Sequence, residues 1–132
     1  KIHNIKIEYT HSKILFNLHR VRNTGTVYAV ESSFDAIKLR QQGIPAVATL
    51  GANVSNKQCD LLLKYFNQVI VIGDNDEAGK MMGEKVLTKV GSRGIIITLP
   101  ERFKDVGELT TEDITKLHEK VSNPITLLGE TV

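Results

Sequence analysis

Four short apolar runs, separated by amphipathic stretches, constrain the fold of this chain more than any other feature of its sequence. The clearest run, residues 69–72, is four β-branched residues in a row, which is typical of a strand buried on both faces. Such strands, when they alternate with helices, are joined by right-handed crossovers and form a parallel sheet. We therefore predict an α/β fold of three layers, in which helices flank a central, mostly parallel four-stranded sheet. The runs are residues 27–30, 46–50, 69–72 and 95–99.

The stretches between the runs carry helical periodicity and signals for helix ends. In the first of them, we predict that Phe34, Ile37 and Leu39 lie near one face of a helix that ends at Gly43. The last begins at Thr110-x-x-Asp113, which has the form of a capping box. The predicted helices cover residues 34–42, the stretch from Ser55 to Phe66, residues 78–90 and residues 110–121.

Composition excludes several classes of protein. The 132 residues suffice for one domain, and no run approaches the roughly 18 apolar residues that a transmembrane helix needs. The single cysteine, Cys59, excludes an internal disulfide and a multi-cysteine zinc site. It also suits a reducing compartment, so we expect a cytoplasmic protein that does not bind membranes. The four histidines show no metal-ligand spacing.

Charge is distributed unevenly along the chain. Residues 1–24 carry five basic side chains against one acidic side chain, whereas the remainder has a balance of −2 within a total of +2. A basic segment of this kind is typical of a protein that binds a polyanion. We predict that residues 1–24 end a preceding subdomain, that residues 25–122 form the α/β domain and that residues 123–132 are a tail. Ile5, Ile7 and Tyr9 alternate as in a strand, and residues 14–18 fit a strand or a helix.

Acidic side chains follow three of the four predicted strands. Because ligands of open parallel sheets bind beyond the carboxyl ends of the strands, these carboxylates are expected to meet at one edge. Like charges held close together require a cation, and a set of oxygen ligands selects Mg²⁺ or Mn²⁺. The sharpest element is Asp74-x-Asp76, where a tight turn lets both carboxylates face one ion and Gly79 allows a close backbone approach. The carboxylates are Glu31 and Asp35, then Asp74, Asp76 and Glu77, then Glu101, Asp105 and Glu108.

Simpler structural roles remain open at these positions. Asp35 lies in the first turn of a predicted helix, where it interacts favourably with the helix dipole. Asp74 or Asp76 is placed to cap the helix that starts near residue 78. Asp105 and Glu108 fit a solvated loop. Glu31 is the hardest to explain in this way, because an acidic residue that ends a buried strand is costly without a partner.

Three familiar enzyme motifs are absent from the sequence. Residues 51–57 lack the second glycine of a GxxxxGK[ST] phosphate loop, and no GxGxxG opens a predicted helix. A serine nucleophile elbow is also absent. Phosphatases with an Asp-x-Asp nucleophile carry that motif after their first strand, whereas here it follows the third.

Four motifs together resemble the Toprim domain, the catalytic α/β module of DnaG-like primases, type IA and II topoisomerases and some nucleases. The resemblance spans residues 26–120 and is strongest to the primase branch. The short segment at residues 13–18 also resembles the basic segment that precedes the Toprim part of primases. The motifs are Val30-Glu31-Ser32-Ser33-Phe34-Asp35-Ala36, Ala48-Thr49-Leu50-Gly51, Asp74-Asn75-Asp76-Glu77-Ala78-Gly79 and Lys104-Asp105-Val106-Gly107-Glu108-Leu109.

This resemblance implies a DNA primase, an Mg²⁺-dependent nucleotidyltransferase that makes RNA primers on a DNA template, with Mn²⁺ as a substitute metal. Its implied partners are single-stranded DNA, nucleoside triphosphates and a replicative helicase, fused or recruited. The 132 residues are expected to be insufficient for activity alone. The residues implied as catalytic are Glu31, Asp74 and Asp76; those three and Asp105 would bind metal, and Lys13, Asp35, Gly51 and Lys104 would contact nucleotide or nucleic acid.

The chain departs from the primase pattern at one position, and two other functions remain open. Primases usually have glycine directly after the glutamate, where this chain has Ser32. Because serine holds a positive φ only at a cost, we expect the turn after Glu31 to differ. The alternatives are a Toprim nuclease, which hydrolyses phosphodiesters with the same metal chemistry, and a non-catalytic Toprim module that binds nucleic acid.

Overall fold

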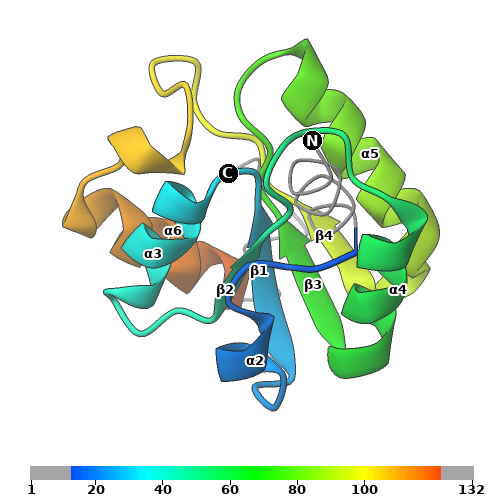
Figure 1. Ribbon diagram of the computed structural model, residues 1–132. Helices are drawn as coiled ribbons and strands as arrows, with labels where there is room; N and C mark the ends of the chain where they lie inside the picture. The colour runs from blue at the N-terminus through cyan, green and yellow to red at the C-terminus, as the bar shows by residue number, and fades with distance from the viewer. Residues whose placement is uncertain (1–12, 123–132) are drawn as a thin grey trace, which may run out of the picture.

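The sheet has four parallel strands in the order β2-β1-β3-β4 (Figure 1). The computed structural model describes residues 13–122. Because β1 and β3 lie at the centre of the sheet, the segments that follow them emerge side by side at one edge. The predicted parallel α/β fold is therefore confirmed. The strands are β1 Thr26–Val30, β2 Ala46–Ala48, β3 Gln68–Val71 and β4 Gly94–Ile96.

Helices cover both faces of the sheet, as the figure shows. Tyr28 and Ile70 point to the face covered by α3 (Ser33–Arg40) and α6 (Thr111–Ser122). Val27 and Val69 point to the face covered by α4 (Asn56–Tyr65) and α5 (Glu77–Val90). Strand residues that are apolar on both faces thus produce two hydrophobic cores, one on each side. Shorter elements are α2 (Leu18–Val21), η1 (Gly91–Arg93) and η2 (Val106–Glu108).

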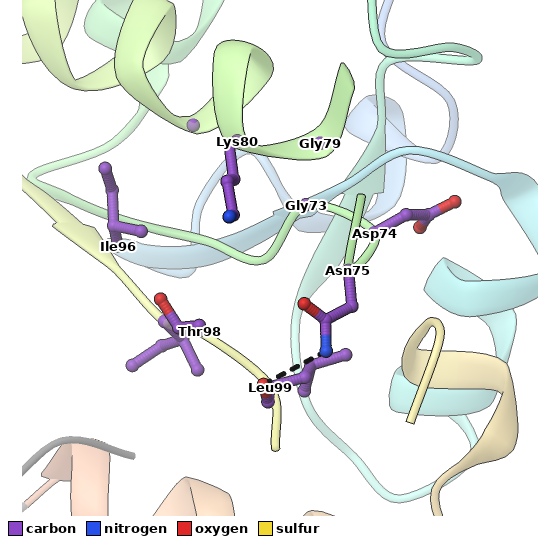
Figure 2. Close-up of a pocket in the computed structure, with 10 residues that line it drawn as sticks. Gly73, Asp74, Asn75, Gly79, Lys80, Ile96, Thr98 and Leu99 are labelled. Atoms are coloured by element: carbon purple, nitrogen blue, oxygen red, sulfur yellow. Dashed lines mark hydrogen bonds between the residues drawn. The ribbon is translucent and has the colours of Figure 1, made fainter. Parts of the chain in front are cut away.

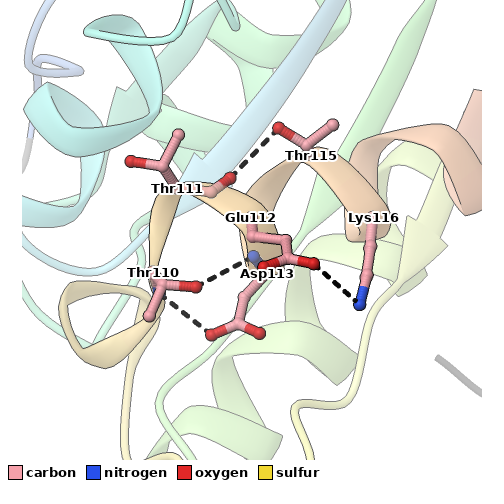
Figure 3. A network of polar contacts seen from close by, with 6 residues as sticks. All are labelled: Thr110, Thr111, Glu112, Asp113, Thr115 and Lys116. Carbon is pink, nitrogen blue, oxygen red and sulfur yellow. Dashed lines mark hydrogen bonds and ion pairs between the residues drawn. The ribbon is translucent and has the colours of Figure 1, made fainter.

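Polar caps define the ends of the helices at the positions that the sequence indicates. Ser55 and Gln58 form a complete capping box at the start of α4. At α6, the Thr110 hydroxyl accepts a bond from the Asp113 backbone N–H, and the Asp113 carboxylate accepts one from the Thr110 N–H (Figure 3). Cys59 is buried on α4, as a small hydrophobic residue.

The apolar face predicted for α3 is buried only at Leu39. Phe34 is 81% exposed and Ile37 is also exposed, whereas Asp35, Ala36 and Leu39 are buried. The helix starts at Ser33 and turns the stripe that contains Asp35 toward the sheet edge, which leaves Phe34 in solvent. Apolar spacing alone did not reveal that a carboxylate occupies the inward side.

Two strands are shorter than predicted. Strand β2 ends at Ala48, because Leu50 takes a φ of 64°, which is incompatible with an extended strand. Strand β4 ends at Ile96, although the Ile97 N–H still donates to the Val71 carbonyl at 2.9 Å. The chain beyond Ile97 therefore leaves the ladder and becomes a loop that leads to Asp105.

The segment before β1 packs against the edge of the sheet beside β2. Phe16 forms an isolated antiparallel bridge with Ala48, and α2 follows directly. Residues 14–18 therefore contain both a bridge and the start of a helix. The predicted strand at Ile5, Ile7 and Tyr9 and the tail at residues 123–132 lie outside the described residues. Among residues 13–122, no helix is long and apolar enough to span a membrane.

Candidate functional site

Glu31 joins the ends of the two central strands. It directly follows β1, is only 9% exposed and accepts a hydrogen bond through Oε2 from the backbone N–H of Asp74, just beyond β3. The partner that a buried glutamate needs is therefore a peptide group. Burial raises the pKa of Glu31, the Asp74 N–H lowers it, and the negative charges of Asp74 and Asp76 raise it further.

The turn between β3 and α5 brings its backbone unusually close together. A Cβ atom placed on Gly79 would lie 1.9 Å from the Asp74 carbonyl oxygen, and one on Gly73 would lie 2.2 Å from the Gly79 carbonyl oxygen. Only glycine fits at either position without a backbone shift. The close approach that the sequence predicts at Gly79 is therefore present.

The two aspartates of this turn have different surroundings. Asp76 is exposed and caps α5, because its Oδ1 accepts a hydrogen bond from the Gly79 N–H at 2.8 Å. Asp74 is half-buried, and its carboxylate points away from the side-chain amide of Asn75 (Figure 2). Burial and the charges of Asp105 and Asp76 raise the pKa of Asp74, whereas a side-chain hydrogen bond with Glu31 and then the nearby charge of Lys104 lower it. Helix capping is thus an observed role of Asp76 and not of Asp74.

Asp35 is a buried carboxyl group on the first turn of α3. It is 3% exposed, and burial followed by the charges of Asp105 and Asp74 raises its pKa to about 6, although the Gly107 N–H and the Ser32 hydroxyl stabilise the charged form. Ser32 caps α3 by accepting a bond from the Asp35 N–H at 3.2 Å. The Ser32 backbone has φ −111° and ψ 155°, so the turn after Glu31 does not require glycine.

The loop after β4 brings Asp105 against Asp35. Oδ1 of Asp105 and Oδ1 of Asp35 lie 3.0 and 3.2 Å from the point where a Cβ on Gly107 would be, so the absence of a side chain at Gly107 leaves room for both carboxylates. The Lys38 ammonium of α3 donates to the Gly107 carbonyl at 2.6 Å and holds η2 against the helix. Asp105 is consequently half-buried rather than solvated, whereas Glu108 is exposed and accepts a bond from the Lys104 N–H.

The structure therefore gathers four carboxylates, named here the acidic edge, at the carboxyl ends of the central strands. Among residues 13–122, no lysine or arginine forms an ion pair with any of them. The same residues contain no group of three or more His, Cys, Asp or Glu side chains placed to hold one ion by themselves. Mg²⁺ needs no such cage, since one or two carboxylates with water and substrate phosphates commonly suffice. The donor set of the acidic edge, Glu31, Asp35, Asp74 and Asp105, fits a hard divalent cation of this kind.

The other predicted binding residues lie at different distances from the acidic edge. Lys104 is close enough to influence the pKa of Asp74, and the Gly51 N–H donates to the Glu31 carbonyl oxygen at 3.0 Å. Lys13 instead lines a groove beside α4 together with Arg22 and Tyr65. Lys104 and Gly51 thus lie near the carboxylates, and Lys13 belongs to another part of the surface.

Sequence reasoning missed the side chains that hold the site together. Lys38 resembles any basic residue on an exposed helix face, and its bond to Gly107 spans 69 residues. Asn75 occupies the unspecified position of Asp-x-Asp, yet it contacts the loop that carries Asp105. A polar residue within a motif was the only available signal for Asn75, and no signal marked Lys38.

The fold and the acidic edge define a family. The sequence profile described as Toprim-like matches residues 28–110, which is more than half of the chain. The chain therefore belongs to the Toprim-like family, and its resemblance to the Toprim domain of DnaG-like primases is confirmed.

Relatives of the chain include DNA primases. That of Mycoplasma pneumoniae is 34% identical over 107 residues, which cover 74% of this chain and 17% of the relative. That of Thermotoga maritima is 35% identical over 91 residues, which cover 67% of this chain and 16% of the relative. The crystal structure of the zinc-binding and RNA polymerase domains of Aquifex aeolicus primase aligns with a TM-score of 0.69 and 26% identity, over 83% of this chain and 29% of that one. This chain thus spans about one sixth of the length of the Mycoplasma and Thermotoga primases.

Proposed function

We propose that this chain is the metal-binding catalytic part of a DNA primase, which joins ribonucleotides on a single-stranded DNA template and releases pyrophosphate. The observation that carries the proposal is the acidic edge. Segments far apart in the sequence bring Glu31, Asp35, Asp74 and Asp105 together, and none of the four forms an ion pair with a lysine or arginine among residues 13–122, although Lys104 lies near Asp74. A scaffold has no reason to crowd buried carboxylates, whereas a metal-dependent transferase needs them.

In the proposed reaction, Glu31, Asp74, Asp76 and Asp105 would hold Mg²⁺. The bound ion supplies charge neutralisation for the triphosphate and a lower pKa for the attacking 3′-hydroxyl. Glu31 accepts the Asp74 N–H bond at Oε2 and shares a side-chain hydrogen bond with Asp74, so it is held where it would act either as a metal ligand or, instead, as a general base. Asp76 caps α5 through Oδ1 only, and its Oδ2 is not used by that cap.

The remaining site residues are assigned to nucleotide or nucleic acid. Lys104 beside Asp74 is suited to bind phosphate, and the Gly51 backbone lies beside Glu31. We also assign Asp35 to nucleotide binding and Lys13 to nucleic acid. Residues 25–122 would form the catalytic domain, with a replicative helicase, fused or recruited, as a partner. Primer synthesis is expected to require the longer parent protein, because the chain spans only part of its relatives.

The proposal is tested by Asp74→Asn and Asp76→Asn in the full parent protein. Asparagine keeps the volume of aspartate and also caps helices, so α5 should stay intact in Asp76→Asn. We expect primer synthesis to fall at least about 100-fold in each variant, because a charged metal ligand is lost. Asp60→Asn, an exposed position on α4, is the matched control.

Full primer synthesis by both site variants would contradict the proposal. Cleavage of single-stranded DNA with Mn²⁺ and without nucleotides would indicate the nuclease alternative instead. If neither Mg²⁺ nor Mn²⁺ shifts the thermal unfolding of the chain, the non-catalytic module would be favoured.

A further inference from the structure

Asn75, the residue between the two aspartates of the turn, connects the end of β3 to the loop that carries Asp105. Its Nδ2 atom lies 3.0 Å from the Phe103 carbonyl oxygen, 3.1 Å from that of Pro100 and 3.3 Å from that of Leu99. Its backbone N–H donates to the Lys104 carbonyl at 2.6 Å. Asn75 thus bonds to carbonyl groups at four positions in this loop, and Figure 2 shows its side chain directed toward Leu99.

These bonds replace those of a strand that has ended. Strand β4 stops at Ile96, and beyond Ile97 the chain no longer pairs with β3. Carbonyl groups that leave a ladder need other donors. The amide of Asn75 has two hydrogens but faces three carbonyl oxygens, so one of its hydrogens is shared between two of them.

The same loop is anchored a second time on the far side of Asp105. Lys38 of α3 donates to the Gly107 carbonyl, and Asp35 accepts a bond from the Gly107 N–H. Asp105 therefore lies between an anchor in the β3–α5 turn and an anchor on α3. Its charge affects both Asp74 and Asp35, as expected for a carboxylate held between them.

We propose that Asn75 is a positioning residue that holds the Asp105 loop beside Asp74 and so sets the spacing of the carboxylates that bind metal. This inference rests on the proposed function, because the spacing matters only if the acidic edge binds a cation. Asn75 acts through the loop and does not touch the ion, since its amide points to the loop carbonyls while the Asp74 carboxylate points elsewhere. Groups that orient metal ligands commonly affect affinity about 10- to 100-fold.

Two substitutions separate this role from direct metal binding. Asn75→Ala removes the amide and keeps the backbone N–H that bonds Lys104. Asn75→Asp keeps the shape but replaces the donors with an oxygen that repels the loop carbonyls, while it adds a negative charge near the site. A metal-ligand role predicts that Asn75→Asp binds Mn²⁺ more tightly than the wild type. A positioning role predicts that both substitutions weaken binding.

The experiment uses the 132-residue chain, with Asn67→Ala as a control at an exposed asparagine away from the acidic edge. Amide hydrogen exchange is measured at Phe103, Lys104 and Glu108, whose N–H groups are bonded within the loop. Mn²⁺ affinity is measured by calorimetric titration, and global stability by urea unfolding. We expect both Asn75 variants to exchange faster at these amides and to bind Mn²⁺ at least about tenfold more weakly, with exchange in the sheet unchanged.

Each other outcome overturns part of the argument. Unchanged loop exchange would show that Asn75 does not hold the loop. Faster exchange with unchanged Mn²⁺ affinity would show a purely structural role, and tighter binding by Asn75→Asp would make the residue a ligand. If the wild type itself binds no Mn²⁺, the proposed function fails, and the exchange data alone then show whether the Asn75 anchor exists.

Discussion

The turns that follow β1 and β3 reach the same edge of the sheet, but they begin their helices in different ways. After β1, the Ser32 hydroxyl caps α3, and both Glu31 and Asp35 remain buried beside the site. After β3, the Asp76 carboxylate caps α5 and stays exposed. A serine cap therefore leaves both acidic residues of its turn available for the site, whereas an aspartate cap uses one acidic residue of its turn to bond the start of the helix.

The two turns also differ in what their backbones require. The β3–α5 turn depends on contact between Gly73 and Gly79 that leaves no room for a Cβ atom. The β1–α3 turn has extended backbone at Ser32 and depends on side-chain bonds instead. We therefore expect substitutions to affect the first turn through steric overlap and the second through charge and capping.

The largest effect is expected for Gly79→Ala, which would place a Cβ atom 1.9 Å from the Asp74 carbonyl oxygen. The backbone of the turn would have to shift, at a cost of about 3 kcal/mol in the free energy of unfolding. Gly83→Ala on the same helix is the control, because its Cβ would meet the Ile96 side chain at an ordinary 3.6 Å. That control should gain up to about 1 kcal/mol from helix propensity. Equal urea-unfolding midpoints for the two variants would contradict the steric argument.

A smaller effect, which depends on pH, is expected for Asp35→Asn. Folding raises the pKa of Asp35 from 3.8 to about 6, so the folded state binds this proton more tightly than the unfolded state. The resulting stabilisation is complete below pH 3.8 and is lost as pH rises through 6, at a cost of up to about 3 kcal/mol by neutral pH. The free energy of unfolding of Asp35→Asn, compared with that of the wild type, should therefore be higher at pH 7 than at pH 4.

The measurement for Asp35→Asn is urea unfolding of the metal-free chain at intervals between pH 4 and pH 7. Asp60→Asn serves as the control, because this aspartate is exposed on α4. Parallel pH profiles for Asp35→Asn and the wild type would show that burial of Asp35 does not destabilise its charged form. Added Mg²⁺ should stabilise the wild type at pH 7 more than the variant if the ion neutralises the acidic edge.

The smallest effect is expected at Ser32. Ser32→Ala removes the oxygen that accepts the Asp35 N–H bond and should cost about 1 kcal/mol, whereas Ser32→Gly should cost only about 0.3 kcal/mol. Both values are accessible by urea unfolding at pH 7. A loss above about 2 kcal/mol in Ser32→Gly would mean that the β1–α3 turn depends on the serine for more than its cap.

Local sequence patterns predicted most of the strands and helices, because a strand or a helix cap depends on residues only a few positions apart. The β-branched run after Gln68 became β3, and the Ser55 and Thr110 caps formed as their spacing indicates. The same reasoning failed on α3, where Phe34 is exposed and Asp35 is buried. Helical spacing shows which apolar residues share a face of the helix. It cannot show that the α3 face directed toward the sheet also borders a polar site.

The sequence by itself determined the layered fold and the acidic character of one sheet edge, since strands that all run parallel have their carboxyl ends at the same edge. Only the tertiary structure decided which of these groups meet. Glu31 bonds to a residue 43 positions away, and Asn75 reaches a carbonyl 28 positions away. Such contacts depend on how helices and loops pack across the sheet. No spacing within a segment encodes them, and they determine which carboxylates are buried, which cap a helix and which share a site.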